Sequence, residues 1–225
     1  MSYQKTKTDP KLGYAVQKHL EELGLQTPIT KAIDTDEKEK IGVIEANFRE
    51  IMRVMGLDLS DDSLIDTPKR VAKMYVLEKF WGLKPENFPK CTTIENKMGY
   101  DEMVVEKGVK VMSDCEHHFV QIDGQATVAY IPKNKVLGLS KLNRIVEYFS
   151  RRPQVQERLT QQIGETLKFI LDTEDVAVVV TGKHYCVISR GVEDTGSVTS
   201  TSYLSGKFKS DPICRSEFLA LSRTC

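Results

Sequence analysis

The sequence of 225 residues has no apolar run of about 18 residues, and its start, MSYQKTKTDPKLG, lacks the apolar stretch of a signal peptide. We therefore expect no membrane span and a cytoplasmic location. Net charge is missing too, because 32 basic residues balance 32 acidic ones. This balance excludes a protein-wide basic surface for nucleic acid or membrane. Any site for an anion has to be a local cluster.

Cysteine is too scarce and too irregularly spaced to cross-link a small secreted domain. Reduced thiols, or thiolates on a metal, are the better interpretation. The chain has 40% hydrophobic residues, which is enough for a real core in one domain with an extension or in two small domains. The cysteines are Cys91, Cys115, Cys186, Cys214 and Cys225.

The first 90 residues predict an arm followed by helices. Residues 1–33 mix charges, Pro and Gly around one short helix within Tyr14–Leu25, and we expect a peripheral arm. Residues 34–90 form a helical subdomain, in which apolar residues recur at helical spacing before Gly56. A second helix is expected to start with Thr67 as its cap and Pro68 at its first position. The apolar residues of the first helix are Ile41, Ile44, Phe48, Ile51, Met52 and Met55.

Residues 91–225 change to strand-rich composition and predict a separate catalytic domain. The predicted order is two strands, two helices and two strands, which favours an α+β fold with an antiparallel sheet and helices on one face. A last helix is expected over about 212–223. The strands are predicted at Met103–Met112, Gln125–Ile131, Val176–Thr181 and His184–Ser189, and the helices at Ser140–Ser150, with Ser140 as cap, and from after Pro153 to Leu171.

Histidine is also scarce, yet three of the four histidines fall in two short segments that hold two of the five cysteines, CEHH at 115–118 and HYC at 184–186. If 184–189 is a strand, His184 and Cys186 share one face and Tyr185 points to the other. Thiolate and imidazole are ligands that zinc prefers, and three protein ligands plus water make a catalytic site. Five candidates exceed that need, so the surplus histidines are suited to moving protons. The spacing does not say which residues are ligands.

Three other interpretations of these two segments stay open at this point. They are a closed structural zinc site, a disulfide between Cys115 and Cys186, and core histidines that bond to the backbone.

A basic segment, SKLNRIVEYFSRR, places Lys141 and Arg144 three residues apart near a helix start, which suits phosphate. Ordinary solvated helix surface is the alternative. Gln156 and Glu157 open the next helix, where a carboxylate is favoured by the helix dipole alone. A carboxylate can also accept two parallel hydrogen bonds from guanine.

Together, several motifs resemble GTP cyclohydrolase I over about residues 40–222. They are SDCEHHFVQIDGQATVAYIPKNKVLGLSKLNRIVEYFSRRPQVQERLTQQI, HYCVISRG, TSTSYLSGKF, ENKMGYDEMV and DDSLIDTPKRVAKMY. The resemblance implies a tunnelling fold, with a four-stranded antiparallel sheet, two helices on one face and an N-terminal helical extension, assembled into a toroidal homodecamer. It also implies conversion of GTP and water to 7,8-dihydroneopterin triphosphate and formate, the first step toward folate.

The same resemblance assigns a role to each candidate residue. It implies Zn²⁺ on Cys115, His118 and Cys186, with His117 and His184 as the proton-transfer pair. Guanine recognition is implied for Gln156 and Glu157, triphosphate or ribose contacts for Ser140, Lys141, Arg144 and Arg190, and phosphate contacts from a neighbouring subunit for Arg70 and Lys73.

Two rival functions remain. Other tunnelling-fold enzymes handle pterins and deazapurines through different metal or thiol sites, and the CEHH and HYC segments argue against them. A structural zinc module that binds RNA or protein is the second rival, and the neutral composition argues against it.

Overall fold

The computed structural model describes residues 7–223. The helices are α1 (Pro10–Glu22), α2 (Glu37–Val54), α3 (Thr67–Lys73), α4 (Leu139–Ser150), α5 (Gln156–Leu171), α6 (Tyr185–Ile188), α7 (Lys207–Ser210) and α8 (Pro212–Arg223). The strands are β1 (Thr93–Glu95), β2 (Val104–Cys115), β3 (Gln121–Tyr130), β4 (Lys135–Leu137), β5 (Pro153–Gln154), β6 (Val176–His184) and β7 (Thr199–Leu204). Short 3-10 helices span Lys31–Asp34, Trp81–Leu83 and Pro85–Asn87, and a π-helical turn spans Met74–Lys79.

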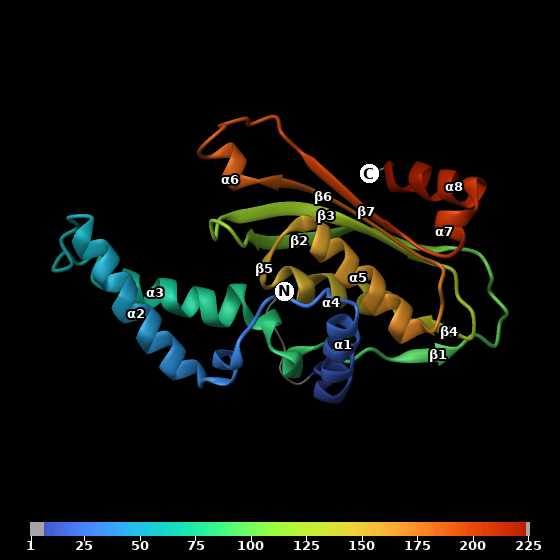
Figure 1. The fold of residues 1–225 in the computed structure, drawn as a ribbon, viewed down its shortest axis with the longest axis horizontal. Coiled ribbons are helices and arrows are strands. Elements are labelled where there is room, and N and C mark those ends of the chain that lie inside the picture. The colour runs from blue at the N-terminus through green and yellow to red at the C-terminus, as the bar shows by residue number, and fades with distance from the viewer. Residues whose placement is uncertain (1–6, 224–225) are drawn as a thin grey trace.

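The main sheet has the strand order β5-β2-β3-β6-β7, and β2, β3, β6 and β7 are antiparallel to their neighbours. The sequence predicted neither β7 nor β5, a two-residue strand parallel to the end of β2. Helices α4 and α5 cover one face of the sheet, and α8 lies on the other (Figure 1). The α+β prediction, with helices packed on an antiparallel sheet, is confirmed.

The core forms where alternate residues of the sheet meet one face of each of the two long helices, as their periodicities require. The arm enters this same core, since Val16 and Leu20 of α1 are buried in it. Gln162 of α5 also donates a hydrogen bond to the carbonyl oxygen of Leu25 at 2.6 Å. The expected arm helix is therefore present, but it is packed into the core and is not peripheral. Other members of the core are Val111, Val128, Leu142, Ile145, Leu159, Ile163 and Val178.

Gly13 lets α1 approach the segment that follows α3, and Gly13→Ala is expected to disturb that contact. A Cβ there would lie 1.9 Å from the backbone oxygen of Pro85, so the overpacking should lower the free energy of unfolding by about 1–3 kcal/mol. Gly42→Ala is the matched control, since it too lies inside a helix but meets nothing within 4 Å. Urea unfolding compares the two variants. Equal midpoints for Gly13→Ala and wild type would show that the arm tolerates displacement.

Helices α2 and α3 project from the sheet as a pair (Figure 1). Asp36 caps α2 by accepting a hydrogen bond from the Lys38 amide, and Gly56 follows the helix with a φ of 80°. The predicted helix is confirmed, but its apolar side chains are mostly uncovered. Met52 is buried, whereas Val43, Ile51, Val54 and Met55 are exposed. Within residues 7–223, no helix combines the length and the apolarity that crossing a membrane requires.

Two predicted helix caps are wrong by one or two positions. Thr67 is the first residue of α3, after Asp66 as cap, and Ser140 is the second residue of α4, after Gly138 as cap. Neither helix has a side-chain hydrogen bond at its cap. Pro68 in the first turn of α3, which needs no amide hydrogen there, does fit the structure.

The strand predicted at 184–189 is also wrong. Strand β6 continues without a break to His184, which pairs with Ile122 near the first residue of β3. Beyond that point β3 offers only Gln121, and the chain turns into the short helix α6. Val187 and Ile188 favour a strand by composition, but without a partner strand that preference has no effect.

Candidate functional site

The CEHH segment forms the tight connection between β2 and β3. The Cys115 amide donates to the Val120 oxygen and the Phe119 amide to the Cys115 oxygen, each at 2.8 Å. Phe119 takes a left-handed φ of 54°, which costs about 1 kcal/mol for a residue with a Cβ. Its ring packs edge-on against Phe80 and Tyr75, with centroids 5.4 and 6.0 Å away. The aromatic contacts offset that cost and hold the loop.

Ion pairs that sequence reasoning missed hold the same loop from both sides. Asp114, which is buried, is bonded to Lys79 of the π-helical turn. Glu116 is bonded to Arg158 of α5, and its amide donates to the Gln154 oxygen at 3.1 Å. The position of Glu116 inside the CEHH motif could have indicated that it has a role at the site. Lys79 lies in no such motif, so nothing in the sequence indicated its role.

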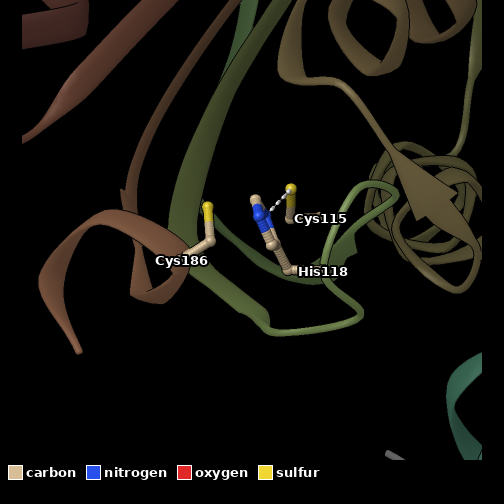
Figure 2. Close-up of side chains that lie close together, drawn as sticks. All are labelled: Cys115, His118 and Cys186. Atoms are coloured by element: carbon tan, nitrogen blue, oxygen red, sulfur yellow. Dashed lines mark hydrogen bonds between the residues drawn. The ribbon is translucent and has the colours of Figure 1, made fainter. Parts of the chain in front are cut away.

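The loop brings two sulfurs and an imidazole together. The ligand atoms of Cys115, His118 and Cys186 all lie within 4.8 Å of one another. Figure 2 shows Cys115, the last residue of β2, and His118 on the following loop, with Cys186 of α6 facing them. His118 Nδ1 is 4.0 Å from the Cys115 sulfur, and His117 Nδ1 is 3.7 Å from it. Although the strand predicted at 184–189 is absent, Cys186 still meets Cys115 and His118, because α6 carries it to the same point.

This donor set fits zinc. Two thiols and one imidazole are ligands that zinc prefers, and three protein ligands leave a fourth position for water. Burial, and next the neighbouring Cys115, raises the pKa of the Cys186 thiol, while Arg190 opposes the rise. A bound cation reverses this by stabilising the thiolates. The three residues can therefore hold a metal ion.

The other interpretations of the two segments fit the structure less well. Cys115 and Cys186 are free thiols, not a disulfide. His117 and His118 are exposed, so they are not core residues. Within residues 7–223, the group at this place has three members, fewer than a closed four-ligand site needs.

His184, the last residue of β6, lies two residues before Cys186 in the chain. Its Nε2 is 2.8 Å from Oε1 of Gln156, the first residue of α5. Burial lowers the pKa of His184, and the charge of Glu157, which is exposed, opposes that shift. Arg190, just beyond α6, brings its Nη1 to 2.8 Å from Nε2 of His118. The structure thus gathers most of the predicted residues at one end of the sheet.

The predicted residues of α4 lie elsewhere. Helix α4 begins just after β4 and ends just before β5, and it is β5 that pairs with Cys115. Ser140, Lys141 and Arg144 are in the first turns, and Ser140 is roughly 15 Å along the helix axis from Ser150. In one chain these residues are therefore far from the ligand group.

The last two predicted residues, Arg70 and Lys73, lie on α3, just before the π-helical turn that contacts the end of β2 through Lys79 and Asp114. Arg70 is exposed and pairs with Asp66 at 3.7 Å. Its guanidinium is open to solvent, which leaves it accessible to an anion.

Comparison with known proteins agrees with this geometry. A sequence profile described as GTP cyclohydrolase I matches residues 44–223. A protein of Shewanella sp. (strain ANA-3) named GTP cyclohydrolase 1 is 57% identical over 208 residues, which cover 92% of this chain and 96% of that protein. Proteins with the same name from Shewanella oneidensis and Shewanella denitrificans are 56% and 57% identical, over 92% and 91% of this chain and 96% and 94% of their own lengths. The chain therefore belongs to the GTP cyclohydrolase I family.

Proposed function

We propose that this protein is a zinc-dependent GTP cyclohydrolase I, which hydrolyses the imidazole ring of GTP and yields 7,8-dihydroneopterin triphosphate and formate, the first step toward folate. The observation that carries the proposal is the convergence of Cys115, His118 and Cys186 within 4.8 Å. His184, two residues before Cys186 in the chain, adds the proton-transfer residue that ring opening needs. Family membership supports the same activity.

The chemistry divides among residues of this chain. Cys115, His118 and Cys186 would hold zinc, which supplies a water with a pKa near neutrality for attack on C8 of guanine. His117 and His184 would move protons to and from the opening ring. Glu157, which is exposed and follows Gln156 at the start of α5, can accept two parallel hydrogen bonds from guanine.

The contact between Arg190 and His118 suggests why Arg190 is suited to bind phosphate. A guanidinium only donates hydrogen bonds, so Nε2 of His118 accepts from Arg190. An imidazole that coordinates a metal through Nδ1 carries its proton on Nε2 and can no longer accept there. If His118 were to bind the metal through Nδ1, its Nε2 would no longer accept from Arg190, whose planar donor pair would then be available to a phosphate.

We further infer that the working protein is a homo-oligomer, a decamer with sites between subunits. The α4 cations lie far from the ligand group within one chain, which favours a site completed by another copy. Arg70 and Lys73 would contact phosphate in a neighbour's site. The exposed apolar residues of α2 are consistent with burial between copies.

We also propose three further properties of this protein. They are the tunnelling fold, a division into an arm (1–33), a helical subdomain (34–90) and a catalytic domain (91–225), and a cytoplasmic location.

The direct test measures metal and product together. Purified protein is expected to hold about one zinc per chain and to turn GTP into formate and a pterin that fluoresces after oxidation. Light scattering on the same sample gives the mass of the active species. Zinc-loaded protein that releases neither formate nor pterin would contradict the activity and favour a structural zinc module.

Glu157→Ala is expected to weaken GTP binding by about 1–3 kcal/mol, because buried guanine donors lose their acceptor. Zinc content should stay at the wild-type level, since Glu157 is outside the ligand group. Calorimetry with a GTP analogue whose imidazole ring resists hydrolysis measures the change in affinity. Gln161→Ala, an exposed position one turn later on α5, is the control and should bind normally. Unchanged affinity in Glu157→Ala would leave Glu157 only a role at the helix start.

A further inference from the structure

The side chain of Gln156 is buried between α5, β6 and β7, and its contacts fix which way its amide points. Nε2 lies 3.0 Å from the Val180 oxygen, 3.0 Å from the Thr199 oxygen and 3.2 Å from Thr201 Oγ1. Backbone carbonyls only accept hydrogen bonds, so the atom that faces two of them has to be the NH₂ group. A flipped amide would set an oxygen against two carbonyl oxygens. Oε1 therefore faces His184.

The hydroxyls of Thr160 and Thr201 agree with this orientation of the Gln156 amide. Thr160 Oγ1 donates to the Gln156 backbone oxygen at 2.8 Å, which uses its one hydrogen. In the 2.6 Å contact between Thr160 and Thr201, Thr201 must then be the donor. Thr201 Oγ1 remains free to accept from the Gln156 amide. Every donor among Gln156, Thr160 and Thr201 thus meets an acceptor. The flipped amide would leave two carbonyl oxygens facing an oxygen.

The orientation of the Gln156 amide determines which ring nitrogen of His184 carries the proton. Its Nε2 lies 2.8 Å from Gln156 Oε1, and an amide oxygen only accepts, so Nε2 carries a proton. A neutral imidazole has one N–H, and Nδ1 is then the nitrogen with the free lone pair. Building on the proposed function, we propose that Gln156 is a positioning residue that holds His184 as the Nε2–H tautomer, with Nδ1 as the atom that takes and returns the proton.

This role differs from the guanine contact that resemblance implied for Gln156. The two hydrogens of its NH₂ group already face three acceptors within the protein, and the residue is 2% exposed. Recognition of the base is left to the exposed Glu157 next to it. The neighbouring residues of α5 therefore divide the work, one orienting His184 and the other binding guanine.

The surrounding backbone keeps Oε1 in place. A Cβ on Gly182 would lie 3.1 Å from Gln156 Oε1 and 3.2 Å from Ile122 Cγ2. The glycine thus lets β6 pass close to the amide, two residues before His184. A buried amide with packed walls holds its partner's ring in one orientation.

The experiment compares Gln156→Met with Thr201→Val in the zinc-loaded protein. Methionine has similar length but offers His184 no oxygen, and we expect kcat to fall about 100-fold, as for lost orienting partners of catalytic histidines. KM for GTP and zinc content should stay near wild type. Thr201→Val also removes a hydrogen bond from this buried network but leaves Oε1 on His184, so it should keep most of its kcat.

A second measurement does not depend on activity. The ¹⁵N spectrum of histidine-labelled wild-type protein, with the His184 signals assigned by their loss in His184→Ala, is expected to show a protonated Nε2 and an unprotonated Nδ1. Gln156→Met should lose that preference. This spectrum decides the tautomer even if Gln156→Met does not fold.

Two results would overturn the positioning role. One is a raised KM with an unchanged kcat in Gln156→Met, which would mean a direct guanine contact. The other is a wild-type His184 with its proton on Nδ1. Failure of the proposed function is separate, because it would appear as wild-type protein that holds zinc but does not convert GTP.

Discussion

Cys186→Ser is expected to lose zinc and turnover together. The Cys186 sulfur is one of three ligand atoms that lie within 4.8 Å of one another, and a serine hydroxyl does not ionise to replace a thiolate on zinc. Loss of a partner outside the ligand set already costs about 10- to 100-fold in affinity or activity. Loss of a ligand should therefore cost at least about 100-fold. Zinc content after dialysis, and formate release from GTP, measure the two effects on the same sample.

Cys214→Ser is the matched control for this variant. Cys214 is a free, half-buried thiol on α8, whose neighbouring side chains pack on the opposite face of the sheet from α4 and α5. Its replacement should leave zinc and turnover at wild-type levels. Wild-type zinc content in Cys186→Ser would show that the ligand assignment is wrong.

The sequence predicted the main elements because their periodicity reflects burial on one face. Helix α5 has Leu159, Ile163 and Leu167 toward the sheet, and the sequence placed its end at Leu171 correctly. The two cysteines and the histidines were also recognisable, because few residue types bind zinc and these were concentrated in two segments. Local composition was sufficient in both cases.

Features that depend on long-range pairing were not predictable in the same way. The end of β6 at His184 is set by where β3 begins, at Gln121, far earlier in the chain, so the composition of 184–189 alone gave a wrong prediction. The contact of Lys79 with Asp114 and that of Gln156 with His184 depend on tertiary packing. Gln156 is the clearest case, since a glutamine at a helix start gives no sign that its amide is buried against β6 and β7.

His184→Ala is expected to keep its zinc and lose turnover. His184 lies outside the three-member ligand group and is bonded to Gln156, so its removal takes away no zinc ligand. A positioned general acid or base contributes about 10²- to 10⁴-fold to rate, and kcat should fall within that range. Zinc analysis and single-turnover formate release separate metal loss from loss of chemistry.

Lys183→Ala is the matched control, because Lys183 is the neighbouring residue on β6 and its side chain is exposed. Strand alternation directs it to the opposite face from His184, so its loss perturbs the same strand without touching the imidazole. It should retain both zinc and turnover. If His184→Ala lost zinc as Cys186→Ser does, His184 would belong among the ligands, and the proton transfers would have to be assigned to His117 alone.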